Sequence, residues 1–194
     1  RVRVSDEEVR RQFLVNQDKR NIKYVLLTTE TGRSAVQVKP AEVEKFLADP
    51  AKVNIAKSQY EAKKATDYKN LTFDLARTKI VTEILQGEKI EEIRKVNEKL
   101  ADQVVATMTA DKGSDARVNA MLKPYKVDVK STGLVARQNT YLPGIGDAPE
   151  LLKSAFAGET KAKKYVIGTG IVVAVVTETQ KPDLAKLDAE RPAL

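Results

Sequence analysis

Residue types that could perform chemistry are few in this chain, and the missing types narrow the possibilities. The 194 residues include no histidine, no cysteine and no tryptophan. This composition excludes Ser-His-Asp and Cys-His nucleophiles, histidine-ligated haem, zinc fingers and iron–sulfur clusters. Chemistry based on carboxylates, and metals bound through oxygen ligands, remain open.

Two pairs of adjacent carboxylates, Glu7–Glu8 and Glu91–Glu92, are the candidates for acid–base chemistry. Such chemistry needs two carboxyl groups that face one cleft. Neighbouring residues on a helix point about 100° apart. Both pairs are therefore interpreted as solvated helix faces.

Two short glycine motifs, Gly144–Gly146 and Gly168–Gly170, could suggest loops that bind phosphate. Neither has the G-x-G-x-x-G or G-x-x-x-x-G-K pattern between a strand and a helix. Both are interpreted as turns, and the sequence predicts no cofactor and no metal site.

The charge balance is basic, with 34 Lys and Arg against 27 Asp and Glu and a net charge of +7. Bulk charge of this size is weak evidence for nucleic-acid binding, and the short cluster Lys161–Lys164 is interpreted as solvated. We expect no nucleic-acid partner. No apolar run reaches the roughly 18–20 residues that span a bilayer, and the best candidate, Val166–Thr177, is typical of strands.

The first part of the chain predicts helices around one strand. Ser5–Glu8 has the form of a capping box, which predicts a helix to about Gln17. Residues 21–28 are typical of a strand that is partly buried on both faces. Pro40 and the Asp49–Pro50 pair predict the starts of two further helices.

The longest predicted element is one helix from Thr72 to about Ala110. Nine residues separate Ile84 from Ile93, and they turn a helix by about 900°, or two and a half turns. The apolar stripe therefore moves to the opposite face of the helix between these two residues. Gly87 lies at the change. Either the helix kinks there, or its two halves pack on different partners, and we favour the second.

The last third predicts a small sheet. Residues 125–130 alternate as in a half-buried strand, residues 149–157 form a short helix, and the runs 165–167 and 171–177 flank a hairpin turn. The predicted class is α+β. A lone strand cannot satisfy its backbone groups, so residues 21–28 are expected to join the C-terminal strands. The predicted regions are 1–110, 111–180 and a tail, 181–194.

Several segments resemble the periplasmic parvulin-type foldases and chaperones of the PpiD and SurA class. The helix openings that recur in this class resemble two segments here, VSDEEVRRQF and VKPAEVEKFL. The segment that precedes their parvulin domain resembles QYEAKK, and the helix that follows that domain resembles LTFDLARTKIVTEIL. TGLVARQNTYLPGIGDAPELLKSAF and YVIGTGIVVAVVTETQKPDL resemble the C-terminal segment, itself similar to half a parvulin fold. The order of these motifs is the stronger signal.

The resemblance implies a parvulin domain inserted near residues 64–70, which this sequence lacks. Parvulin sites use a pair of histidines. Here NIKYVLLT looks like the first parvulin strand, with Tyr24 in the place of a histidine. The resemblance therefore implies a helical chaperone region and a small parvulin-like sheet without a competent isomerase site.

The function implied is a holdase module of a peptidyl-prolyl isomerase and chaperone, whose partners are unfolded or newly translocated polypeptides. Its expected location is the periplasm, with an inner-membrane anchor outside this sequence. The candidate client-binding residues are Phe46, Tyr60 and Phe73, although each alone is more typical of a core residue. The alternatives are that the chain itself is an isomerase, or that its long helix forms a homodimer for assembly.

Overall fold

The computed structural model describes residues 5–110 and 115–186 and divides the chain into two compact units. The sheet unit comprises the residues up to Thr28 and those from Glu98 onward, and the helical unit comprises Thr29–Asn97. The boundary lies at residue 97 rather than at the expected residue 110. Residues 187–194 of the expected tail lie outside the described part of the chain.

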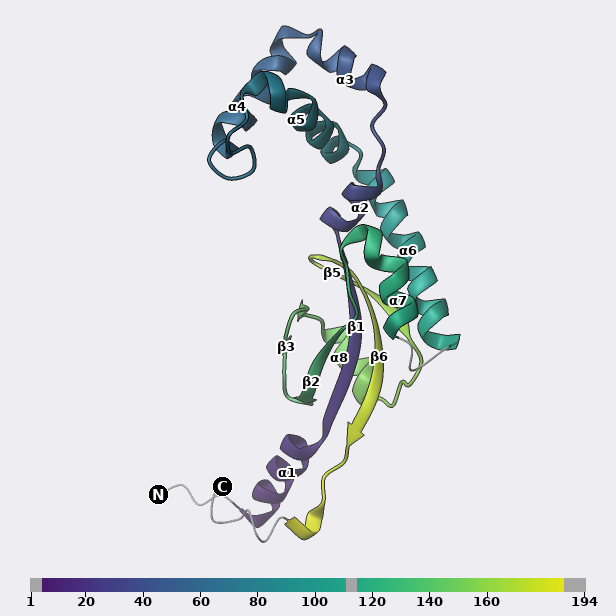
Figure 1. The fold of residues 1–194 in the computed structure, drawn as a ribbon. Helices are drawn as coiled ribbons and strands as arrows, with labels where there is room; N and C mark the ends of the chain where they lie inside the picture. Colours follow the sequence, from purple (N-terminus) through teal and green to yellow (C-terminus); the bar gives the residue numbers. More distant parts are fainter. Residues whose placement is uncertain (1–4, 111–114, 187–194) are drawn as a thin grey trace. The chain divides into compact units, whose positions relative to one another are not determined.

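The sheet unit is built on four antiparallel strands in the order β2-β1-β6-β5 (Figure 1). They are β1 (Lys19–Thr28), β2 (Lys130–Ala136), β5 (Lys163–Ile167) and β6 (Gly170–Gln180). The predicted α+β class is confirmed. The pairing of β1 with β6 also confirms that the early strand joins the C-terminal strands. A separate small ladder pairs β3 (Tyr141–Leu142) with β4 (Gly146–Asp147).

The pairing of β1 with each of its two neighbouring strands is irregular beside Asn21. On β6, Glu178 and Val176 pair with consecutive residues of β1, so Thr177 is an extra residue in that ladder. On β2, both Thr132 and Gly133 lie opposite a single residue of β1. The extra groups find partners locally. Ser131 Oγ donates to Asn21 Oδ1 at 2.6 Å, and Thr177 Oγ1 donates to the Asn21 carbonyl at 3.3 Å. These bulges bend the sheet while its polar groups stay satisfied.

One face of the sheet is covered by helix α8 (Pro149–Phe156), which begins with a proline at its first turn. Tyr24, Ile22 and Val172 lie on this face and pack with the helix in one core. Its buried members are Ile22, Tyr24, Val135, Leu142, Ile145, Ala148, Leu151, Leu152, Ala155, Val172 and Ala174.

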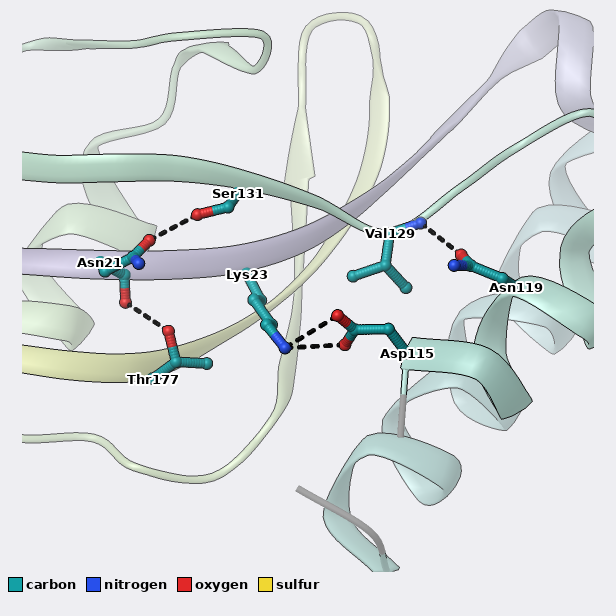
Figure 2. A network of polar contacts seen from close by, with 7 residues as sticks. All are labelled: Asn21, Lys23, Asp115, Asn119, Val129, Ser131 and Thr177. Carbon is teal, nitrogen blue, oxygen red and sulfur yellow. Dashed lines mark hydrogen bonds and ion pairs between the residues drawn. The ribbon is translucent and has the colours of Figure 1, made fainter. Parts of the chain in front are cut away.

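Polar contacts join the opposite face to α7 (Asp115–Leu122) and to the second half of α6 (Ile90–Ala110). Lys23 Nζ lies 2.9 Å from both carboxylate oxygens of Asp115, and the Val129 N–H donates to Asn119 Oδ1 at 2.8 Å (Figure 2). Lys164 Nζ donates to an oxygen of Asp102 in α6 at 2.6 Å. Helix α1 (Asp6–Gln17) also belongs to this unit, with the predicted Ser5 cap in place.

The helical unit contains α2 (Thr29–Ala35), α3 (Pro40–Leu47), α4 (Pro50–Lys63) and α5 (Phe73–Glu88) (Figure 1). The predicted starts at Pro40 and Pro50 are both observed. The buried core of this unit comprises Val43, Phe46, Ala56, Tyr68, Ala76, Ile80 and Val81.

The single long helix predicted from Thr72 to Ala110 is wrong, because the chain breaks it at Lys89. Lys89 has φ −88° and ψ 47°, and its N–H bonds to the carbonyl of Gln86. Its ammonium group reaches the Gln37 carbonyl at 3.2 Å and the Glu42 carboxylate at 3.1 Å. These contacts stabilise a turn that periodicity does not reveal. Helix α6 then carries the chain from one unit into the other.

Candidate functional site

The three candidate residues Phe46, Tyr60 and Phe73 belong to one cluster in the helical unit. Phe46 projects from α3 and is only 3% exposed, so it is a core residue. Tyr60, near the end of α4, and Phe73, the first residue of α5, are half-buried and pack against the same core. Of the three, only the last two reach the surface.

Tyr60 is the centre of an aromatic contact chain. Its ring is stacked on that of Tyr68 at 6.1 Å between centroids and meets that of Phe73 edge-on at 5.8 Å. Its hydroxyl donates to the carbonyl of Leu71 at 2.7 Å. Offset-stacked and edge-on pairs of this kind stabilise a cluster beyond the area that they bury. The aromatic rings therefore fix the turn between α4 and α5.

Tyr68 completes this cluster, and the sequence does not single it out. It lies in a polar segment, yet its side chain is only 1% exposed and its hydroxyl donates to Glu83 at 2.7 Å. Burial, followed by the hydrogen bond to Glu83, raises the pKa of Tyr68 to about 12. No periodic signal identifies a buried residue in a turn of this kind.

The turn itself occupies residues 64–70, where the resemblance expects an inserted parvulin domain. The N–H groups of Thr66, Asp67 and Tyr68 all bond to the carbonyl of Lys63, and Asn70 adopts a left-handed conformation with φ 67°. In this sequence the segment is a tight turn that connects α4 to α5, and the side chain of Tyr68 packs it against the core.

Three large apolar side chains of the helical unit are exposed. Leu71 lies in the segment before α5 and is 39% exposed, Leu75 on α5 is 72% exposed, and Ile55 on α4 is 57% exposed. Exposed apolar side chains are the groups that another chain would cover on binding. Sequence periodicity did not select these residues, because it identifies the face that a helix buries.

Lysine side chains lie over the aromatic rings of the same unit. The Nζ of Lys57 is 5.9 Å from the centre of the Phe73 ring, and that of Lys79 is 5.5 Å from the centre of the Tyr68 ring. Such contacts are electrostatically favourable and keep the ammonium groups near apolar surface. The cluster therefore presents apolar and cationic groups together.

Tyr24, which the sequence resemblance aligns with a parvulin histidine, is buried in the sheet unit. Its side chain is 3% exposed, its hydroxyl donates to the Pro143 carbonyl at 3.3 Å, and burial raises its pKa. A Cβ atom at Gly144 would lie 2.1 Å from the hydroxyl oxygen, so only glycine fits there. The hydroxyl holds a loop in place and offers a substrate no access.

Within residues 5–110 and 115–186, no group of three or more carboxylates is placed to hold a metal ion. Within the same ranges, no helix combines the length and apolar character needed to cross a bilayer.

Comparison with known proteins identifies no relative: no protein-family model, no curated protein and no solved structure matches this chain. The case for a function therefore depends on the geometry described above, with the sequence resemblance beside it.

Proposed function

We propose that this chain is a holdase module of a periplasmic foldase of the PpiD and SurA type, which binds unfolded or newly translocated polypeptides without nucleotide or metal. The observation that carries the proposal is the exposure of three large apolar side chains of the helical unit, Ile55, Leu71 and Leu75. In the same unit, lysine ammonium groups lie near the rings of Phe73 and Tyr68.

Exposed apolar side chains of this kind suit a partner without a fixed shape. Unfolded chains expose scattered aliphatic and aromatic side chains, and their burial stabilises a complex by roughly 25 cal/mol per Å² of apolar area. The lysines keep the helical unit soluble and attract acidic stretches. Tyr60 and Phe73 are half-buried against the core of this unit, and Phe46 lies in that core.

The alternative, that the chain itself isomerises X-Pro bonds, is weakened by the burial of Tyr24. An isomerase needs a site that a proline-containing segment can enter. In our proposal that activity belongs to a part of the parent protein outside this sequence, as does any membrane anchor.

The test is suppression of aggregation of a chemically denatured client enzyme, followed by light scattering. We expect the Ile55→Ser and Leu75→Ser double variant to need several-fold more protein than the wild type for equal suppression. Leu134→Ser is the matched control, because Leu134 is an exposed leucine of the sheet unit, at 44%. Equal loss in the control, or no loss in the double variant, would contradict the proposal.

Two further readouts separate the alternatives. The wild-type chain is expected not to accelerate a proline-limited refolding step, and acceleration would favour the isomerase function. A mass that rises with concentration, without suppression of aggregation, would instead favour an assembly protein that forms homodimers.

A further inference from the structure

Strand β5 forms one edge of the four-stranded sheet, and its pairing with β6 is regular. The register runs without a shift from Lys163 opposite Ala174 to Ile167 opposite Gly170. The other edge strand, β2, is interrupted by the bulge at Thr132 and Gly133. A bulge protects an edge from further pairing, so of the two edges of this sheet, as residues 5–110 and 115–186 form it, β5 offers the straighter template.

The backbone of β5 is oriented to accept another strand. A two-residue turn makes Ile167 and Gly170 the closing hydrogen-bonded pair, and such pairs alternate along an antiparallel ladder. Tyr165 therefore bonds toward β6, whereas the N–H and C=O groups of Lys164 and Val166 point away from it. These outward groups match the spacing of an added antiparallel strand.

The side chains of the edge indicate what such a strand would carry. Val166 is 86% exposed, the highest value among the large apolar residues described as exposed. Its cross-strand neighbour Ile171 is 8% exposed, so the apolar strip of that face continues to the edge. An apolar side chain on an added strand would cover Val166.

The charge of the same edge is positive. Lys163 pairs with Glu159 and Lys164 with Asp102, yet the lysine side chains stay 52% and 44% exposed. Each ammonium has three donors, so both lysines keep donors for another carboxylate. Lys161 adds a third exposed positive charge nearby. Three lysines against the carboxylates of Glu159 and Asp102 leave one net positive charge at this edge. That charge favours an added acidic strand over the same edge of a second copy.

We propose that β5 binds an extended, acidic segment of a client polypeptide as a fifth strand of the sheet. The inference rests on the proposed holdase function and places a second client contact in the sheet unit. Main-chain hydrogen bonds to Lys164 and Val166 supply affinity for any extended chain, and the lysines select acidic segments.

The first experiment uses the full chain and fluorescein-labelled nonapeptides, with binding followed by anisotropy. The probe alternates Glu and Val. We expect it to bind at least tenfold more tightly than the peptide that alternates Lys and Val. A version of the probe with methyl groups on alternate backbone nitrogens should lose binding at least tenfold, because it cannot complete the ladder. Equal binding of the methylated and unmethylated probes would overturn strand addition.

Variants test the edge itself. Val166→Pro removes one outward donor without removing a hydrogen bond to β6, and should weaken probe binding at least tenfold. Val166→Thr keeps that donor and is the matched control. Lys161→Glu should weaken binding of the Glu–Val peptide and strengthen binding of the Lys–Val peptide, which keeps the proposal testable if the proline variant misfolds. No change in either Val166→Pro or Lys161→Glu would overturn it.

The inference and the proposed function can fail separately. If the wild-type chain suppresses aggregation but binds none of the peptides, strand addition is wrong and the holdase function stands. If it binds the probe but does not suppress aggregation, the holdase function is wrong and strand addition stands.

Discussion

The core of the sheet unit is formed by residues far apart in the sequence, whereas the core of the helical unit is formed by residues close together in it. The core beneath α8 joins residues from Ile22 to Ala174, whereas the core of the helical unit comes from residues 43–81. The first contains many aliphatic side chains around Tyr24, and the second is organised around stacked tyrosines. The helical unit is therefore a structure of local contacts inserted into one of long-range contacts, so a destabilising substitution should affect a different set of residues in each unit.

The largest effect is expected from Tyr24→Ala in the sheet unit. Loss of the buried ring should lower the free energy of unfolding by about 4 kcal/mol. Hydrogen exchange should lose protection in both β1 and β6, because these strands pair along their length. Tyr24→Phe keeps the ring and is the control. If protection were lost in only one of the two strands, the sheet unit would not be one cooperative structure.

The corresponding change in the helical unit is Ile80→Ala, at a side chain that is fully buried in α5. It should cost about 3 kcal/mol. Loss of protection should stay within residues 40–88 and leave β1 and β6 unchanged. Thr82→Ala, on the same helix, is the control. Equal loss across both units would remove the distinction between them.

A smaller effect, with a characteristic pH dependence, is expected from Tyr68→Phe. Removing the hydrogen bond to Glu83 should cost about 1.5 kcal/mol at neutral pH. The pKa of Tyr68 is raised from 10.0 to about 12, so the folded state disfavours the anion. This contribution is complete below pH 10 and is lost as the pH rises toward 12.

Urea unfolding at several pH values from 8 to 12 checks this prediction. The wild-type chain should lose more stability than Tyr68→Phe above pH 10. Tyr141→Phe, at an exposed tyrosine of the sheet unit, should follow the wild type. Parallel curves for the wild type and Tyr68→Phe would show that the cluster does not depend on a neutral Tyr68.

The smallest effects should be equal in the two units. Asp49 accepts a hydrogen bond from the Ala51 N–H at 2.9 Å, and Ser5 accepts one from the Glu8 N–H at 3.2 Å. Asp49→Ala and Ser5→Ala should each cost about 1 kcal/mol in thermal or urea unfolding, because helix capping is local. A cost several times larger for either change would mean that the cap also holds tertiary structure.

Local signals in the sequence predicted much of the fold. The Ser5 cap and the prolines at residues 40, 50 and 149 mark the starts of helices, and the Gly168–Gly170 turn marks the hairpin. Each of these features acts within four residues. The pairing of β1 with the distant β6 was also predictable, because a buried strand requires a partner.

Features fixed by tertiary contacts were not predictable. Residues 125–130 alternate like a strand, but Lys126 turns left-handed with φ 56° after a short 3-10 helix, and β2 begins only at Lys130. Residues 29–35, TETGRSA, are polar and small, as is typical of a turn or loop, yet they form helix α2. At Gly32 a Cβ atom would lie 2.6 Å from the Ile93 carbonyl, so this helix depends on a close approach that the local sequence does not encode.

The sequence likewise identified some residues of the candidate site and not others. Composition and family resemblance led to Phe46, Tyr60 and Phe73, which do share one cluster. The exposed Leu75 and the buried Tyr68 were not among the candidate residues. Each is placed by the packing of α4 against α5, which a single sequence does not reveal.

The insertion of the helical unit between strands of one sheet has a consequence for the order of synthesis. Asn21 on β1 and Thr177 on β6 are 156 residues apart. At roughly 5–20 residues per second, β1 leaves the ribosome about 8 to 30 s before its central partner. The helical unit, whose contacts are local, can fold within that interval. A newly made β1 thus spends its first seconds as an unpaired apolar strand, in the same condition as the chains that we propose this protein to bind.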